Sequence, residues 1–143
     1  MASREDISLH ELQALAEFRY NIRLFLRASE NILRDEGLKP QQYQLLLAIK
    51  GLPDSIPATI SAIAERLQLQ HHSTVELTDR LSVRGLVRRK RSGDDRRQVL
   101  LELTPKGDKL LKEMAAMHRE ELRSTAPALV GALRKVLANS KSA

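Results

Sequence analysis

The sequence contains no cysteine, no tryptophan and only four aromatic residues. Without cysteine the protein has no disulfide, no thiolate metal ligand and no cysteine nucleophile, and it cannot sense oxidants through a thiol. It also lacks a run of about 18 apolar residues, the length of a membrane-spanning helix. The N-terminal stretch is charged rather than apolar, so we expect no secretory signal and a cytoplasmic location.

The chain of 143 residues fits one domain, and its charge is unevenly spread. Residues 1–57 carry a net charge of −1, residues 58–104 carry +3 and residues 105–143 carry +4. Between Arg84 and Arg97 lie seven cations and only two acids. Such a density of like charge repels itself unless an anion meets it, which points to a polyanionic partner such as nucleic acid. The alternative is a solvated, charged hairpin.

Apolar residues at helical spacing predict two helices in the first third of the chain. The first covers Leu9–Glu36 and ends at Gly37, a residue type that terminates helices in the left-handed conformation. The second begins with Pro40 at its first position and runs to about Lys50. Residues 51–57 carry the turn signals of a loop. The apolar stripe of the first helix is too long for so small a chain to cover, so we expect it to meet another helix or a second copy of the protein.

Two short helices follow the loop. One begins at Thr59 or Ser61 and ends at Leu67, and the next covers His71–Arg84 before Gly85. Only a few residues join them, and the second helix is polar at its start. This spacing is typical of a helix-turn-helix.

The apolar period then changes from helical to two. Val87–Arg91 and Gln98–Leu103 are predicted as strands, joined by turn residues at Ser92–Asp95. The C-terminal third is predicted to form a helix, an interruption and a last helix, at Pro105–Arg123, Ser124–Pro127 and Pro127–Ala138. The predicted fold is therefore mainly α with a small β-hairpin wing, a winged helix-turn-helix.

Five segments of the chain carry a resemblance to a known family: Ile63-Ala-Glu-Arg-Leu67, Asp79-Arg-Leu81, Arg84-Gly-Leu-Val87, Asp95-Arg-Arg97 and Val99-Leu-Leu-Glu-Leu-Thr-Pro-Lys-Gly107. In this order and spacing they resemble the MarR family of bacterial transcriptional regulators. The resemblance implies one MarR-like domain over 1–143, with a DNA-binding winged helix-turn-helix at 38–104. It implies dimerisation through 1–37 and 105–143, and repression of transcription that a small ligand relieves.

Three positions depart from the family pattern. Lys39 and Gln70 stand where a capping Ser or Thr is common, so both helix starts are expected to be weakly capped. Glu76 stands where a basic or neutral residue is frequent, on the side expected to approach DNA. A carboxylate there can accept a hydrogen bond from cytosine N4.

The predicted DNA contacts come from three places. The first turn of the helix at His71 reaches base edges in helix-turn-helix proteins, and its free N–H groups favour phosphate. An arginine on a narrow hairpin can enter the minor groove, and Arg97 matches the wing arginine of the family. Asp95 is expected to orient it. The full set of expected contacts is Thr59, Ser61, Gln70, His71, His72, Ser73, Thr74, Arg80, Arg88, Arg96 and Arg97.

The terminal helices supply the predicted dimer interface. Its expected members are apolar residues of the first and last helices, namely Leu9, Leu12, Leu15, Leu129, Val130, Leu133, Val136 and Leu137. The four aromatic residues all lie in the first two predicted helices, where they form either ordinary core or a pocket for a small aromatic or phenolic effector.

Catalytic motifs are missing: the sequence has no Gly-rich phosphate loop, no nucleophile elbow and no His-Glu-x-x-His. We therefore expect no enzyme activity, no cofactor and no metal site. Three functions stay open: a ligand-responsive repressor on a palindromic operator, a DNA architectural protein without an effector, and a protein-interaction module on a winged-helix scaffold.

Overall fold

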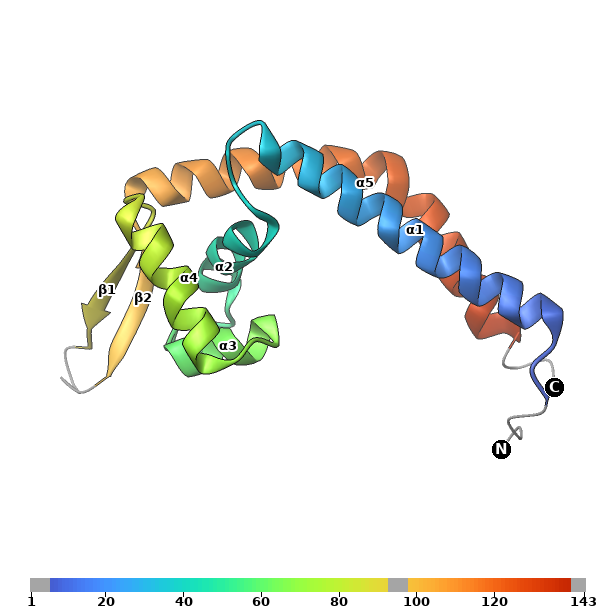
Figure 1. The fold of residues 1–143 in the computed structure, drawn as a ribbon, viewed down its shortest axis with the longest axis horizontal. Helices are drawn as coiled ribbons and strands as arrows, with labels where there is room; N and C mark the ends of the chain where they lie inside the picture. The colour runs from blue at the N-terminus through green and yellow to red at the C-terminus, as the bar shows by residue number, and fades with distance from the viewer. Residues whose placement is uncertain (1–5, 93–97, 140–143) are drawn as a thin grey trace. The chain divides into compact units, whose positions relative to one another are not determined.

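A computed structural model describes residues 6–92 and 98–139 (Figure 1). Its elements in chain order are α1 (Leu9–Arg34), α2 (Pro40–Gly51), α3 (Ile60–Leu67), α4 (His71–Val83), β1 (Val87–Arg91), β2 (Val99–Leu103) and α5 (Pro105–Asn139). The mainly helical fold with one antiparallel hairpin is confirmed. The chain divides into two compact units. We call Leu33–Ala116 the winged-helix unit, and the remainder, up to Ile32 and from Met117, the helical unit.

Local signals end the helices where the sequence predicts. Gly37 and Gly85 adopt positive φ angles of 65° and 75°, which glycine tolerates without strain. Thr59 caps α3, because its Oγ1 accepts a hydrogen bond from the N–H of Ala62 at 3.1 Å. Lys39 and Gln70 make no side-chain cap bond, as expected for their residue types. These caps place α3 and α4 as two short helices joined by a tight turn.

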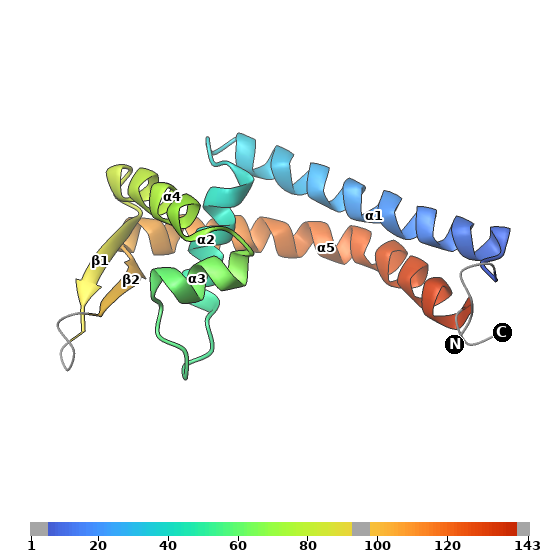
Figure 2. The same ribbon diagram turned by 60° about the horizontal axis from the view of Figure 1, so that its bottom comes forward.

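The core of the winged-helix unit lies between its three short helices and the hairpin. Fully buried apolar side chains come from α2, α3, α4 and the residue before β1, among them Leu45, Leu46, Ile63, Leu81 and Leu86. In the hairpin, Val87 pairs with Leu103 and Arg91 with Val99. The outer edge of β2 is also occupied, since Leu101 N–H donates to the carbonyl of Ala58 at 2.8 Å. Figure 2 shows the hairpin extending away from the short helices.

In the helical unit, α1 and the C-terminal part of α5 lie side by side (Figures 1 and 2). Small or polar residues are buried there, including Ala14, Asn21 and Ala132. Ser29 Oγ and His118 Nε2 are hydrogen-bonded at 2.6 Å, which ties the two helices together. In the ranges that the structure covers, no helix is long and apolar enough to cross a membrane.

The predicted interruption at Ser124–Pro127 is wrong, because α5 is a single helix with Pro127 inside it. Proline removes one backbone donor and clashes with the preceding turn, but that cost of about 3 kcal/mol bends a helix more often than it ends one when the flanks hold. Here Thr125 Oγ1 donates to the carbonyl of Glu121 at 2.9 Å, and Ala132 is buried one turn beyond the proline. The helix is therefore continuous through Pro127, with an intrahelical side-chain bond before the proline and a buried residue after it.

Candidate nucleic-acid interface

The helix α4 has one buried and one exposed face. Thr74, Leu77, Thr78 and Leu81 are buried and attach it to the core of the winged-helix unit. The opposite face carries the exposed side chains of His71, His72, Glu76, Asp79, Arg80 and Val83. This exposed face is polar over its first two turns, so it offers hydrogen-bonding groups rather than an apolar contact.

Thr74 is a predicted DNA contact that the structure contradicts. Its side chain has 0% exposure, and its Oγ1 donates to the carbonyl of Gln70 at 3.0 Å. One turn later Thr78 repeats the arrangement, with Oγ1 donating to the carbonyl of Thr74 at 2.7 Å. Because each hydroxyl is satisfied by its own helix, both threonines fit in the core without an unpaired polar atom.

The remaining polar residues at the start of α4 are accessible. Gln70, His71 and His72 are exposed and Ser73 is half-buried. In the described part of the chain, the side chains of His71 and His72 have no hydrogen-bond or ion-pair partner. The first N–H groups of a helix also lack intrahelical acceptors, so this end favours negative groups.

One cation of the basic run faces into the domain. Arg84 is half-buried, and its guanidinium donates to the carbonyl of Gly37 at 3.1 Å and to Gln42 Oε1 at 3.3 Å. It therefore fastens the end of α4 to the start of α2. Gln42 itself accepts from the backbone N–H of Lys39 at 3.0 Å, which compensates for the missing side-chain cap at that residue.

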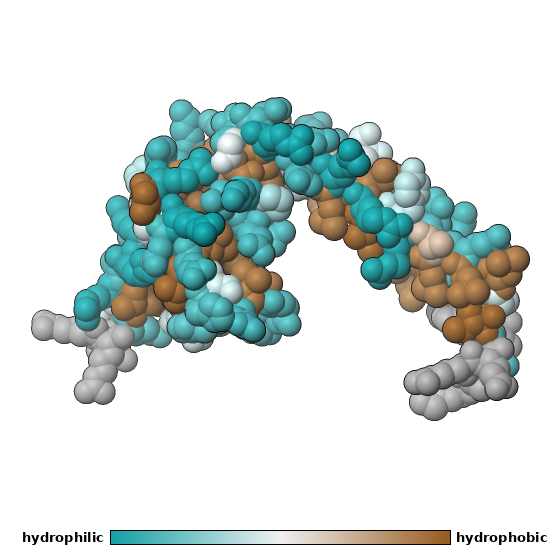
Figure 3. All heavy atoms as spheres, in the orientation of Figure 1, coloured by the Kyte–Doolittle hydropathy of each residue, from teal (hydrophilic) through white to brown (hydrophobic). Residues whose placement is uncertain are grey.

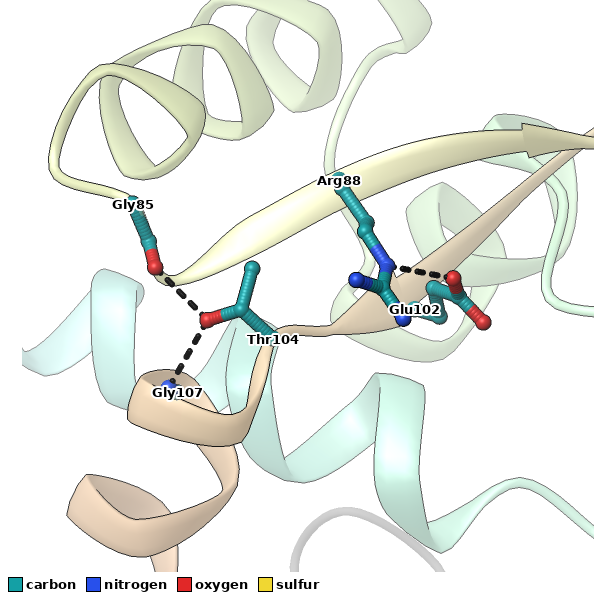
Figure 4. A network of polar contacts seen from close by, with 5 residues as sticks. All are labelled: Gly85, Arg88, Glu102, Thr104 and Gly107. Carbon is teal, nitrogen blue, oxygen red and sulfur yellow. Dashed lines mark hydrogen bonds and ion pairs between the residues drawn. The ribbon is translucent and has the colours of Figure 1, made fainter.

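Two cations of β1 are already paired. Arg88 Nε donates to Glu102 Oε1 at 2.5 Å across the hairpin, as Figure 4 shows. Arg89 donates to Asp79 Oδ1 at 2.7 Å, which links the hairpin to α4. Sequence reasoning missed both acids as partners. The predicted contact from Arg88 must therefore compete with Glu102, and Arg89 positions the hairpin against α4.

Other predicted contacts are placed without such pairs. Arg80 and Ser61 are exposed, whereas Thr59 is half-buried and caps α3. Lys90 is also exposed on β1. The expected wing-tip contacts Asp95, Arg96 and Arg97 lie outside the described residues.

A hydrogen-bonded joint holds the base of the hairpin (Figure 4). Thr104 Oγ1 donates to the carbonyl of Gly85 at 2.6 Å and accepts from the N–H of Gly107 at 3.0 Å. The one side chain therefore connects the end of α4, the end of β2 and the first turn of α5. Gly107 is buried, and a Cβ there would lie 2.0 Å from the carbonyl oxygen of Leu86. Only glycine allows this approach.

A cleft of about 620 Å³ lies between the end of α2, the hairpin and the start of α5. Its charges are paired: Asp108 meets Lys50 at 3.0 Å and Lys112 at 2.7 Å. Hydrogen bonds from these two lysines lower the pKa of the Asp108 carboxyl. No group of three potential metal ligands occurs within the described ranges. The ion pair between Lys50 and Asp108 links the end of α2 to the first turn of α5.

The predicted dimer residues lie on the helical unit, and most are exposed. Leu9 is 70% exposed and Leu137 54%, while Leu129 and Val136 are half-buried. Among the described residues, all of the exposed large apolar side chains except Leu47 and Val83 belong to the helical unit. Figure 3 shows this apolar surface in brown near the chain termini. The others of the predicted set, all exposed, are Leu12, Leu15, Val130 and Leu133.

The winged-helix unit is similar in sequence to a known family. A model of the MarR family matches residues 36–98. YsmB, an uncharacterised HTH-type transcriptional regulator of Bacillus subtilis (strain 168), is 27% identical over 116 residues, which cover 78% of this chain and 77% of that protein. A putative transcriptional regulatory protein for the hcr operon of Thauera aromatica is 30% identical over 105 residues, which cover 72% of this chain and 61% of that protein.

Solved structures share the fold. A mutant of S. aureus MepR bound to an oligodeoxyribonucleotide superposes with a TM-score of 0.65 at 20% identity, covering 87% of this chain and 95% of that one. CouR from Rhodococcus jostii RHA1, bound to p-coumaroyl-CoA, also has a TM-score of 0.65, at 25% identity over 80% of this chain and 81% of that one. The helix-turn-helix, the hairpin and these matches agree: residues 36–98 are similar to the MarR family, and the chain shares its fold with solved MarR family proteins.

Proposed function

We propose that the protein is a sequence-specific repressor that binds a palindromic operator as a homodimer and is released by a small-molecule effector. It catalyses no reaction and needs no cofactor. The observation that carries the proposal is the free polar start of α4, where Gln70, His71 and His72 are exposed beside a basic hairpin. The DNA-bound structure of MepR, a protein of the same fold, supports it. Because its target is the chromosome, the expected compartment stays the cytoplasm.

Each half-site is read by one copy of α4. Amide, imidazole and hydroxyl groups at the start of the helix reach base edges in the major groove, while the exposed cations contact phosphate. Arg80 serves this purpose from α4 and Lys90 from the hairpin. Ser61 at the start of α3 adds a hydroxyl to the phosphate contacts, and Arg96 and Arg97, oriented by Asp95, are proposed to enter the outer minor groove.

A homodimer accounts for the apolar surface of the helical unit. A monomer would leave Leu9, Leu12, Leu133 and Leu137 in water, each between 40% and 70% exposed. Fully burying one such side chain stabilises by about 1.5–3 kcal/mol. In a two-fold contact the same residues are buried in both copies, so each position contributes two side chains. We expect sedimentation to give twice the chain mass of 16.1 kDa at micromolar concentration. A single species at the chain mass would reject the dimer.

The proposed effector is a small aromatic or phenolic compound. CouR, which shares the fold, binds p-coumaroyl-CoA, an aromatic thioester. Three aromatic residues of the helical unit are not fully buried in its core. Tyr20 is 50% exposed and Phe18 and Phe25 are half-buried, so their rings are accessible to an aromatic ligand. The competing function, a DNA architectural protein, has no effector and binds every duplex with one salt dependence.

The test is a footprint on the DNA that flanks the gene, with and without candidate phenolic compounds. We expect protection of an imperfect palindrome whose half-sites are about 10 bp apart, centre to centre, and loss of protection when the effector is added. Uniform protection of any duplex would favour the architectural protein. Absence of any DNA binding would favour the protein-interaction module.

Two arginine variants test whether the DNA contact lies on α4. Arg80→Ala should lower the slope of log affinity against log salt by about one unit, the effect of one lost phosphate contact. Arg19→Ala is the matched control, because Arg19 is an equally exposed arginine on α1 in the helical unit. An equal loss in both variants would contradict the role of α4.

A further inference from the structure

The exposed face of α4 carries two carboxylates in different electrostatic environments. Asp79 Oδ1 accepts a hydrogen bond from Arg89 at 2.7 Å, so its charge is compensated within the domain. Glu76 is exposed, and within the described residues it has no hydrogen-bond or ion-pair partner. Arg80, one turn further along the helix, forms no ion pair with it. The exposed face of α4 therefore presents one carboxylate, that of Glu76, which is not paired within the described residues.

Glu76 lies on the exposed face of α4, together with side chains that are proposed to reach base edges. It follows His72 by one helical turn on the same exposed face, and it precedes Arg80 by one turn. Residues four apart in a helix are neighbours, so Glu76 is flanked by the imidazole of His72 and the guanidinium of Arg80, which both face outward. The buried residues Thr74, Leu77 and Thr78 on the other side of the helix prevent it from turning inward.

A free carboxylate in the major groove is attracted by few partners. An ionised Glu only accepts hydrogen bonds, and the phosphates on either side of the groove repel it. Guanine presents two acceptors, thymine an acceptor and a methyl group, and adenine an acceptor next to its donor. Cytosine presents the N4 amine as a donor with no acceptor of its own beside it. Only cytosine offsets the cost of bringing this charge to DNA.

We propose that Glu76 is a specificity-determining residue that requires a cytosine at one symmetric position in each half-site. It raises the specificity ratio chiefly by weakening the binding of all other sequences. This inference rests on the proposed function, because it assumes that α4 enters the major groove. The fold alone does not predict which base Glu76 recognises.

The variant Glu76→Gln keeps the size of the side chain and removes its charge. Gln pairs bidentately with adenine N6 and N7, so the required cytosine should be lost or replaced by adenine at these positions. The penalty for a wrong base there should fall from roughly 5- to 150-fold, the usual range for one lost base contact, to near unity. Binding to non-specific duplex should become severalfold tighter, because one repulsive charge is gone.

The experiment is a binding selection on randomised duplex with the full chain, followed by affinity measurements over a salt series. Glu65→Gln is the matched control, since Glu65 is an exposed carboxylate on the preceding helix that already accepts a hydrogen bond from Gln68 at 3.2 Å. Wild type and Glu65→Gln should select the same palindrome with cytosine at symmetric positions. Only Glu76→Gln should change those positions and no others. Unchanged thermal unfolding of the three proteins shows that the fold is intact.

Two results would overturn the inference in different ways. A wild-type palindrome that Glu76→Gln leaves unchanged, or one that has no symmetric cytosine, rejects the role of Glu76 and leaves the repressor intact. Recovery of no consensus by the wild type rejects the sequence-specific repressor, and the role of Glu76 with it.

Discussion

The close approach of Gly107 to the segment after α4 gives a sharp test of the hairpin base. In Gly107→Ala the new Cβ would lie 2.0 Å from the carbonyl oxygen of Leu86 and 2.9 Å from its carbonyl carbon. That carbonyl cannot move freely, because it accepts a hydrogen bond from the N–H of Thr104 at 3.1 Å. Overpacking of this kind costs about 1–3 kcal/mol, against a gain of about 0.5–1 kcal/mol from replacing glycine by alanine in a helix. We expect a net loss of about 1–2 kcal/mol.

Gly131 provides the matched control within the same helix. A Cβ at Gly131 meets nothing within 4 Å, so Gly131→Ala should gain about 0.5–1 kcal/mol from helix propensity alone. The two variants should therefore melt on opposite sides of the wild type, with roughly 2–4 °C for each kcal/mol in a chain of this size. All three proteins are measured by urea and thermal unfolding at one concentration, because the proposed dimer would make stability depend on concentration. If Gly107→Ala were as stable as Gly131→Ala, the close approach would not constrain the fold.

Substitutions at three further residues test the contacts around the hairpin. Thr104→Val should lose about 1–2 kcal/mol in urea unfolding because the cap of α5 and the bond to Gly85 both disappear, whereas Thr104→Ser should retain most of that stability. Glu102→Gln should free Arg88 for phosphate and raise the salt slope of non-specific DNA binding by about one unit; an unchanged slope would show that Arg88 stays away from DNA. Asp108→Asn should destabilise the protein at neutral pH, and the difference should vanish as pH falls through the lowered pKa of Asp108, below about pH 4, because the wild-type carboxyl is then protonated too. A difference that persists in acid would assign the effect to packing instead of charge.

Helix ends were predictable because their signals are local. Gly37, Gly85 and Thr59 act through the backbone of their own turn, so residue type and position suffice to place them. The hairpin was predictable for the same reason, from the change of apolar period. Pro127 shows the limit of such signals, because α5 continues through it although a proline usually kinks or ends a helix.

Side-chain partners were less predictable because they depend on register and packing. The predicted strand ends, if Arg91 paired with Gln98, would place Arg88 opposite Leu101, whereas the observed register pairs Arg91 with Val99 and places Arg88 opposite Glu102. The ion pair at Arg88 therefore follows from the length of the connection between the strands. The partner of Arg88 could be predicted from the sequence only if the length of this connection were known.

Thr74 illustrates the same limit in the DNA-binding helix. A polar residue in the first turn of the helix was expected to face DNA, but which residues face outward depends on how α4 packs against the core. Thr74 Oγ1 is satisfied by the carbonyl of Gln70, so its burial carries little polar cost. Thr78 and Leu81 are buried on the inward face of α4, and Thr74 lies one turn before Thr78 on the same face. The helical spacing thus indicates that Thr74 is buried, whereas its polar side chain suggested a DNA contact.

The pairing of the basic run changes what its charge can do. Of its described members, Arg84 holds the domain together, and Arg88 and Arg89 are matched by acids. The exposed face of α4 is nearly neutral, since the charge of Arg80 is opposed by that of Glu76. Attraction to DNA must therefore come mainly from other cations, whereas α4 supplies hydrogen-bonding groups whose value depends on the base they meet. A helix with little net charge adds little affinity for a wrong sequence, because sequence-independent affinity comes from contacts between cations and phosphates. A basic protein with such a helix can therefore still bind its own site selectively.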